Sequence, residues 1–497
     1  MSDAMVAIDL EQESIESLGR RMAAGEITAR TLTQHCLDRI AAIDPKLSAV
    51  IELNPDALTI ADDLDRERAA GTLRGPMHGL PILVKDNLDT GDRMLTTAGS
   101  LALATAPAPA DAYVVKQLRD AGAVVLGKTN LSEWANYRST RSSSGWSSRG
   151  GQTRNAYDQL RSPGGSSSGS AVSVAAAFCV AAIGTETDGS IVSPAAMNSV
   201  VGVKPTVGLV SRSGIIPISH TQDTAGPMAR SVSDAATLLA VICGPDASDA
   251  KTKTAPPIAS AIKSLVLDLN ALAGARIGVA RNYCGFHEGV DALMAAAIDD
   301  LEACGATVLD DLHLTPVLDI RPSEAILMSA EFKVGLNAYL AARGNTVNVH
   351  SLEDVIAFNR IHYEAVMPWF QQELSEKAQE TKGLNDPDYL KAVETCRTLS
   401  RDQGIDRLIS ENLLDAIIAP TTCTAWLIDW INGDNRSGGS AGPAAIAGYP
   451  SVTVPAGYVH GLPIGLTFFS TAWQDAKILN FAYAYEQETR HRVRPRL

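Results

Sequence analysis

Serine hydroxyls and glycines gather in one stretch of the chain, residues 162–206, where they could take part in nucleophilic chemistry. Two Gly/Ser-rich turns, Gly164–Ser170 and Gly184–Ser190, flank a run of small apolar residues, Ala171–Ile183. That run has no charge and no proline, so we expect one buried element between two exposed turns. Glycine tolerates unusual backbone conformations and close approach. The stretch is therefore suited to presenting hydroxyls and backbone N–H groups to a ligand.

Three simple interpretations of these turns fit only parts of the stretch. A phosphate-binding loop requires Gly-x-x-x-x-Gly-Lys-Ser/Thr, but no lysine follows the glycines before Lys204. A serine-hydrolase elbow, Gly-x-Ser-x-Gly, is matched by residues 165–169, but that motif follows a strand, and here Arg-Ser-Pro precedes it. A flexible Gly/Ser linker is disfavoured because buried-type sequence follows at once.

The whole stretch resembles the signature of the amidase signature family. The similar segments are Gly-Gly-Ser-Ser-x-Gly-Ser, an Ala-rich run, Gly-Thr-(acid)-x-x-Gly-Ser-Ile and Gly-Val-Lys-Pro-Thr. Upstream, residues 79–87 resemble the lysine loop of that family, and residues 127–135 and 461–466 resemble further family segments. The similarity covers roughly residues 15–485. It implies an α/β fold with a single large mixed β-sheet covered on both faces by helices.

The resemblance also implies a cofactor-free amide hydrolase with three reacting side chains. Ser190 matches the family's nucleophile, Lys85 its base, and Ser166 the bridging serine, which follows a cis peptide bond. The backbone N–H groups expected to face the oxyanion belong to Thr187, Asp188, Gly189 and Ser190. No histidine lies near these serines in sequence, so a neutral lysine is the available base. Burial would have to lower its pKa from ~10.4 by about 2–3 units.

The sequence departs from the commonest family pattern at three positions. Glu186 replaces an aspartate, Asp188 a glycine and Val192 a frequent arginine. We expect the Asp188 carboxylate to point away from the oxyanion loop, and the missing arginine disfavours small carboxylate substrates. Residues 184–192 are most similar to bacterial peptide amidases, which release ammonia from C-terminally amidated peptides. An aryl-acylamidase, a broad-specificity amide hydrolase and, less favoured, a glutamine-dependent amidotransferase subunit stay open as alternatives.

Aromatic side chains near the family-like segments could line a pocket for peptide or aryl groups. The candidates for substrate contact are Trp134, Tyr137, Trp146 and Trp426, with Trp430 close to the last of them. Core packing explains each of them singly equally well.

Composition and charge exclude several other classes of function. The net charge is −14 and the basic residues are dispersed, which disfavours a nucleic-acid partner. The seven cysteines show no Cys-x-x-Cys spacing and the nine histidines are scattered, so we expect no metal. The acidic N-terminus does not resemble a signal peptide, and no apolar run reaches the length of a membrane span. We expect a cytoplasmic monomer or homodimer with no membrane contact.

Helical and strand patterns alternate along the chain, which indicates a sheet with helices on both faces. We expect an N-terminal helical segment, residues 1–70, packed on an amidase signature α/β domain, residues 71–497, as one compact unit. Residues 138–170 are long irregular structure, often functional in a compact enzyme. Residues 325–411 should form an exterior helical layer. The expected helices are 14–24, 28–44 (ending at Asp44-Pro45), 55–70, 111–120, 234–242 and 291–304, and the expected strands are 81–85, 123–126, 276–280, 306–309, 416–419, 451–454 and 464–468.

Overall fold

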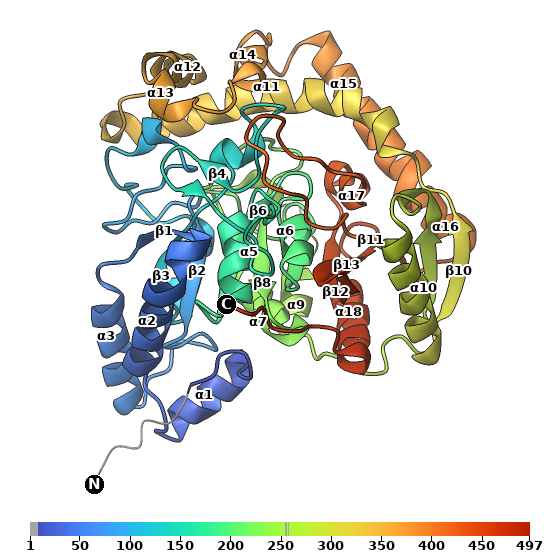
Figure 1. Ribbon diagram of the computed structural model, residues 1–497, viewed down its shortest axis with the longest axis horizontal. Helices are drawn as coiled ribbons and strands as arrows, with labels where there is room; N and C mark the ends of the chain where they lie inside the picture. Colours follow the sequence, from blue (N-terminus) through green and yellow to red (C-terminus); the bar gives the residue numbers. More distant parts are fainter. Residues whose placement is uncertain (1–7, 254–255, 257) are drawn as a thin grey trace.

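One mixed β-sheet of 11 strands forms the centre of the protein (Figure 1). The computed structural model describes residues 8–253, 256 and 258–497. Parallel pairs such as β2 with β3 occur beside antiparallel pairs such as β12 with β13, which confirms the predicted mixed sheet. The strands, in their order across the sheet, are β1 (Val50–Leu53), β3 (Val124–Thr129), β2 (Pro81–Lys85), β6 (Ala181–Glu186), β8 (Thr224–Ala229), β7 (Val201–Lys204), β12 (Ser451–Val459), β13 (Leu462–Phe469), β11 (Ala416–Pro420), β9 (Arg276–Ala280) and β10 (Thr307–Leu312).

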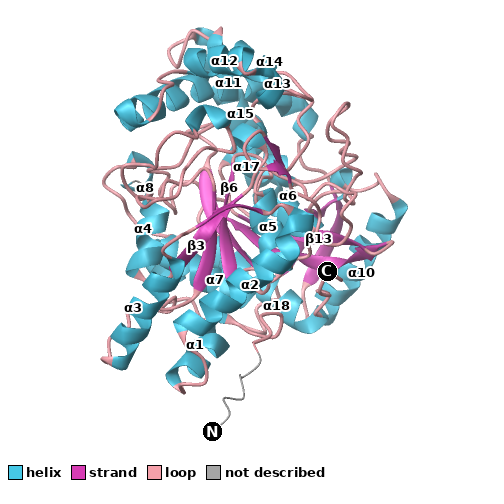
Figure 2. Cartoon of the chain, turned by 60° about the vertical axis from the view of Figure 1, so that its left-hand side comes forward, coloured by secondary structure: helices cyan, strands magenta, loops and turns pink. Residues whose placement is uncertain are grey.

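Helices cover both faces of this sheet, as the sequence predicted (Figure 2). Strands such as β2 and β6 are buried along their whole length, because neither face meets solvent. A small second sheet pairs β4 (Trp146–Ser147) with β5 (Gly151–Gln152). The helices outside the exterior layer are α1 (Ile15–Ala23), α2 (Ala29–Leu47), α3 (Ala57–Ala69), α4 (Tyr113–Asp120), α5 (Ser168–Ala175), α6 (Val192–Met197), α7 (Val232–Ile242), α8 (Ala250–Lys253), α9 (Ile258–Lys263), α10 (Glu288–Ala303), α17 (Ala441–Ala447) and α18 (Asp475–Thr489).

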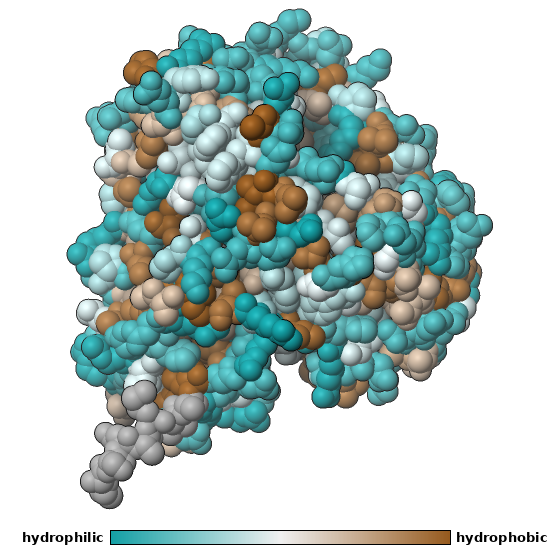
Figure 3. Space-filling view, viewed as in Figure 1, coloured by the Kyte–Doolittle hydropathy of each residue, from teal (hydrophilic) through white to brown (hydrophobic). Residues whose placement is uncertain are grey.

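The exterior helical layer begins earlier than predicted, at Val317. Its longest member, α11, lies across the top of the molecule in Figure 1. Figure 3 shows mainly hydrophilic residues over this layer, consistent with a solvent-facing position. None of the helices in the described residues combines the length and apolar character that a membrane crossing needs. The helices of the layer are α11 (Val317–Arg343), α12 (Leu352–Ile361), α13 (Tyr363–Val366), α14 (Glu373–Gln379), α15 (Pro387–Arg397) and α16 (Asp406–Asn412).

The serine-rich stretch differs from its prediction in two ways. The run Ala171–Ile183 is not one element, since it ends helix α5 and begins strand β6. The two flanking turns, predicted to be exposed, are almost wholly buried. Distant segments cover them, because the N–H of Ser132 donates to Ser166 O and the N–H of Ser162 donates to Trp426 O.

Several element boundaries and strands also differ from the predictions. Helix α2 does not stop at Asp44 but continues to Leu47, with Pro45 in its last turn, where proline removes only one helical hydrogen bond. Strand β1 follows and pairs with β3, so the first 70 residues are not only helical. Strands β7 and β8 were missed; β8 contains both glycine and proline, which argue against a strand interior. The acidic start, residues 1–7, and residues 254, 255 and 257 lie outside the described residues.

Helix α5 can approach its neighbours closely because Gly169 has no side chain. A Cβ at this position would lie 2.2 Å from Ala49 O and 2.6 Å from Asn130 O. We expect Gly169→Ala to lower the free energy of unfolding by about 1–3 kcal/mol or more, because backbone would have to move. Chemical denaturation measures this, with Gly19→Ala in helix α1 as the control, since a Cβ at Gly19 meets nothing within 4 Å. Equal stability of the two variants would contradict the prediction.

Candidate active site

Strand β2 ends at Lys85, whose side chain lies in the interior and is fully buried. Its Nζ lies 2.8 Å from Ser166 Oγ, 2.8 Å from Thr185 Oγ1 and 3.3 Å from Thr185 O. A neutral amine has two hydrogens and one lone pair. If the hydrogens go to the two oxygens of Thr185, the lone pair is left to accept from the Ser166 hydroxyl. The three contacts therefore match a neutral lysine poised as a base.

The pKa of Lys85 is lowered to about 7, chiefly because burial removes water from the charged form. The carboxylates of Asp223 and Glu186 act in the opposite direction and favour the ammonium. Desolvation outweighs them, so a large fraction of Lys85 is neutral near neutral pH. The pKa is lowered somewhat further than the sequence argument required.

Ser166 and Ser190 come from the two turns of the serine-rich stretch. The Gly165–Ser166 peptide bond is cis, as the family resemblance implied. The N–H of Ser167 donates to Ser190 O at 3.1 Å, so the backbones of the two turns are joined directly beside both serines. Ser190 lines a cavity of ≈ 580 Å³, which we name the reaction cavity. Lys85, Ser166 and Ser190 are thus brought to one region.

The loop after strand β6 is organised by the buried carboxylate of Glu186. Its oxygens accept from the N–H groups of Gly189 at 2.9 Å, Ile191 at 2.7 Å and Val192 at 3.0 Å. Gly189 has a φ of 78°, in the left-handed region that favours glycine. The loop therefore depends on both a carboxylate and a glycine in fixed places.

This arrangement changes one of the predicted oxyanion donors. The N–H of Gly189 is already engaged by Glu186, so it is not a free donor for an oxyanion. For the N–H groups of Thr187, Asp188 and Ser190, no acceptor is recorded within the described part of the chain. These three groups remain the candidates for oxyanion stabilisation.

A ring of polar side chains ties the same loop to helix α11. Gln222 Nε2 donates to Thr187 O at 3.2 Å and to Glu324 Oε1 at 3.0 Å. Arg321 donates to Glu324 Oε2 at 2.6 Å and forms an ion pair with Asp188. The carboxylate of Asp188 is therefore held by the exterior layer, and burial raises the pKa of Glu324 to about 7. Glu186 and this ring therefore both hold the loop.

The reaction cavity has mostly polar walls. They include Ser139, Thr140 and Ser142 from the irregular segment that was predicted to be functional. Two arginines, Arg321 and Arg436, share the wall with two carboxylates, Asp188 and Asp434. Such walls offer many hydrogen-bonding groups beside the apolar side chains of Ile218, Met328 and Leu374.

Of the four predicted aromatic contacts, the structure places only Tyr137 at the wall of the reaction cavity. Trp134 is buried in an apolar cluster that also contains Tyr137 but does not itself line the cavity, and Trp146 packs edge-on against Phe370 with ring centroids 5.1 Å apart. Trp426 donates from Nε1 to Asp434 at 3.1 Å and so supports the wall without forming it. Trp430 donates to Gln152 and stacks on Trp369. Aromatic residue type alone did not distinguish core from cavity.

The sequence argument missed the residues that reach the site from outside the family-like motifs. Arg321 and Glu324 lie in helix α11, just before residue 325, where the predicted exterior layer began. Asp434 and Arg436 lie in a long loop, residues 421–440, that carries no motif. The role of Glu186 did have a local signal, since an acidic residue stands just before the glycine turn.

We expect Glu186→Gln to lower kcat by about tenfold or more while the protein still folds. The amide offers one acceptor oxygen in place of two and turns an N–H₂ group toward backbone donors, at a cost of about 1–3 kcal/mol. Steady-state kinetics on an amide substrate measures the effect. The matched control is Glu486→Gln, because that carboxylate also accepts from a backbone N–H, that of Val232. A normal kcat in Glu186→Gln would show that the loop does not need the carboxylate.

Known proteins match this chain over most of its length. The family model described as Amidase matches residues 31–479. A probable amidase of Arabidopsis thaliana is 41% identical, with 98% of this chain and 92% of that protein covered. The native peptide amidase of Stenotrophomonas maltophilia is 50% identical, with a TM-score of 0.92 and 98% of each chain covered. A glutamyl-tRNA(Gln) amidotransferase subunit of Symbiobacterium thermophilum is 36% identical, with 97% of this chain and 98% of that protein covered.

Proposed function

The chain belongs to the amidase family of amide-hydrolysing enzymes, and we propose that it removes the C-terminal carboxamide of peptides as ammonia. The observation that carries the proposal is the buried Lys85 with Ser166 Oγ at 2.8 Å, beside the cavity that Ser190 lines. A base, a hydroxyl relay and a nucleophile are the groups that acyl transfer from an amide requires.

In the proposed acylation, Ser190 Oγ attacks the amide carbon. Ser166 accepts the proton of Ser190 as it passes its own proton to neutral Lys85. The N–H groups of Thr187, Asp188 and Ser190 stabilise the negative oxygen, and each such donor is worth about 3–4 kcal/mol in comparable sites. Collapse of the tetrahedral intermediate breaks the C–N bond. Ser166 delivers a proton to the departing nitrogen and takes back a proton from the Lys85 ammonium, and ammonia leaves an ester on Ser190.

Hydrolysis of that ester repeats the proton transfers with water as the nucleophile. The water oxygen bonds to the acyl carbon while its proton passes through Ser166 to Lys85. The ester bond then breaks, the proton returns to Ser190 Oγ, and the peptide carboxylate is released. No cofactor is consumed in either half of this reaction.

Two observations support a peptide as the acyl group. The identity of 50% to a peptide amidase extends over nearly the whole chain. The polar side chains of the reaction cavity can hydrogen-bond a peptide backbone, and Tyr137 is the one aromatic residue at its wall among the described residues. An aryl-acylamidase is therefore the weaker alternative. Val192, in place of the arginine that is frequent in the family pattern, counts against glutamine as the amide donor.

Ammonia release from a dipeptide amide tests the proposal, with free glutamine and an acyl anilide assayed beside it. We expect release from the dipeptide amide with a kcat/KM at least about tenfold above that for the other two substrates. A preference for the anilide would replace the substrate class. Activity on glutamine alone would support the role of an amidotransferase subunit instead.

A further inference from the structure

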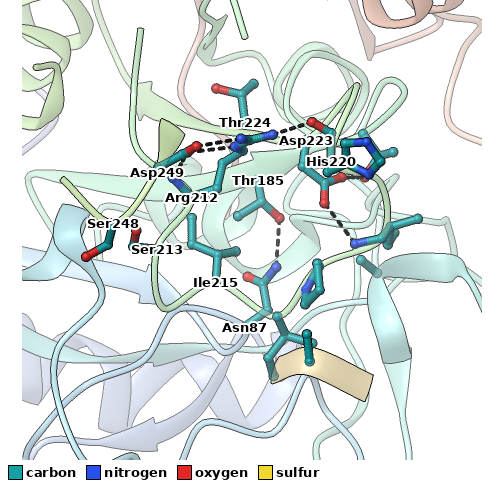
Figure 4. Close-up of a pocket in the computed structure, with 16 residues that line it drawn as sticks. Asn87, Thr185, Arg212, Ser213, Ile215, His220, Asp223, Thr224, Ser248 and Asp249 are labelled. Carbon is teal, nitrogen blue, oxygen red and sulfur yellow. Dashed lines mark hydrogen bonds and ion pairs between the residues drawn. The ribbon is translucent and has the colours of Figure 1, made fainter. Parts of the chain in front are cut away.

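A second cavity, which we name the side chamber, adjoins the reaction cavity (Figure 4). Its volume is ≈ 410 Å³, far more than one water molecule needs. Ala135, Thr187 and Ile218 line both cavities. The side chamber extends from Asn87 and Thr185, beside Lys85, to the exposed residues His220 and Ser248. No step of the proposed mechanism has yet used it.

Thr185 lines the side chamber and has a hydroxyl proton that is available for a further hydrogen bond. Thr185 Oγ1 accepts from Lys85 Nζ at 2.8 Å and from Asn87 Nδ2 at 2.9 Å. A hydroxyl has two lone pairs and one proton, so both lone pairs are occupied. Within the described residues no acceptor is recorded for the proton of this hydroxyl. Thr185 lines the chamber, which is where an acceptor can approach.

Asn87 presents the complementary group. Its side chain is buried, with the residue 2% exposed, and its Oδ1 has no hydrogen-bond partner among the described residues. Buried amide oxygens in proteins are almost always satisfied. Asn87 also lines the side chamber, next to Thr185 in Figure 4. An unused donor and an unused acceptor thus belong to two residues that are joined by a hydrogen bond.

We propose that the side chamber binds a small neutral molecule, water or ammonia, between Thr185 and Asn87, and that it passes such molecules to and from the reaction centre. The bound molecule accepts from the Thr185 hydroxyl and donates to Asn87 Oδ1. The part about passage rests on the proposed function, in which water is consumed and ammonia is produced. The proposed binding of the molecule rests only on the available donor of Thr185 and the available acceptor of Asn87.

The proposed reaction needs a second route by which small molecules can reach and leave the reaction centre. Once the peptide acyl group is joined to Ser190, it fills the reaction cavity and obstructs that route. Water must still arrive and ammonia must still depart at the same carbon. The side chamber meets the reaction cavity at Thr187, in the oxyanion loop.

The charged residues of the side chamber favour the passage of water and ammonia over that of the peptide product. Arg212 is paired with Asp249 through contacts of 2.6 and 2.8 Å, and Asp223 adds a second carboxylate to the same wall. Asp223 Oδ2 accepts from the N–H of Ile218 at 2.8 Å, and burial raises its pKa to about 6. An acidic wall repels the carboxylate product but admits water, ammonia or ammonium. The peptide product therefore leaves through the reaction cavity.

A crystal structure of the full-length unliganded protein tests the binding site without any assay of activity. We expect an ordered density peak at hydrogen-bonding distance, about 2.7–3.2 Å, from both Thr185 Oγ1 and Asn87 Oδ1. Asn87→Leu should remove that peak. A well-ordered side chamber with no peak between the two atoms would overturn the binding proposal, whether or not the protein hydrolyses peptide amides.

Ser248→Trp tests passage by filling the exposed end of the side chamber. Its control is Ala247→Trp, which adds the same bulk at the exposed neighbour outside the chamber wall. We expect kcat for a dipeptide amide to fall about fivefold or more in Ser248→Trp and by less than about twofold in the control, a difference of about 0.5 kcal/mol or more. Equal kcat in both variants would overturn the passage proposal.

The methyl ester of the same dipeptide distinguishes water from ammonia. If water enters through the side chamber, Ser248→Trp slows ester and amide alike, and a burst of methanol reports the accumulated acyl-enzyme. If ammonia leaves through it, only the amide is slowed and no burst develops. Wild-type protein that releases no ammonia from any amide would contradict the proposed function, and the crystallographic result would still decide the binding site.

Discussion

Ser190→Ala is expected to lower kcat for a dipeptide amide by at least about 10⁴-fold, because no acyl-enzyme can form without the nucleophilic oxygen. Residual hydrolysis would require direct attack by water in a site that still stabilises the oxyanion. The variant should also lose reaction with a fluorophosphonate, which labels an activated serine. Mass spectrometry of the labelled wild-type protein should locate the adduct on Ser190.

Ser193→Ala serves as the control for this prediction. Ser193 lies three residues further along the same buried stretch, but it does not line the reaction cavity. Its replacement should leave both labelling and kcat within about threefold of wild type, as expected when no transition-state contact is removed. An adduct on another serine would assign the nucleophile elsewhere. A wild-type protein that resists the reagent would contradict the mechanism.

The candidate reacting residues could be located from sequence because the family resemblance that implies them is carried by short segments of the chain. Ser166 and Ser190 each lie in a short glycine-containing turn, and Lys85 lies at the end of a buried strand. In such segments residue type and spacing nearly determine the backbone. The fold class followed for the same reason, since helix and strand patterns are properties of short segments.

The support of the site could not be predicted in this way. Arg321 lies 133 residues from Asp188, and the ion pair exists only because helix α11 crosses above the loop. The same holds for the burial of the two serine-rich turns, which segments near Ser132 and Trp426 cover. Contacts of this kind depend on how distant elements pack, and single-residue patterns carry no information about that. That Asn87 Oδ1 lacks a hydrogen-bond partner among the described residues can likewise be recognised only once the positions of its neighbours are known.

Lowering the pH from 7 to 5 is expected to reduce kcat/KM for a peptide amide by about 50-fold, since only neutral Lys85 can accept a proton. The pKa of Lys85 is about 7. Below it, the neutral fraction falls about tenfold per pH unit. The rate should therefore rise through pH 7 and level off above pH 8. A profile that is flat between pH 5 and 8 would contradict the role of Lys85 as base.

The same shifted pKa predicts opposite effects of Lys85 on activity and on stability. Its pKa in the folded protein, about 7, lies below the value of ~10.4 in an unfolded chain, so the unfolded state binds more protons between these pH values. Stability should accordingly rise with pH across that range, and at pH 7 or below the buried lysine is a cost to folding. Lys85→Met removes the cost together with the base. We expect a variant with a melting temperature at pH 7 equal to or above that of wild type and with kcat/KM lower by about 10²–10⁴-fold. A lower melting temperature would mean that Lys85 is held mainly for its contacts with Ser166 and Thr185, and the loss of activity could then be ascribed to the fold. A stable but inactive variant would instead show that the enzyme keeps a destabilising group because its chemistry depends on it.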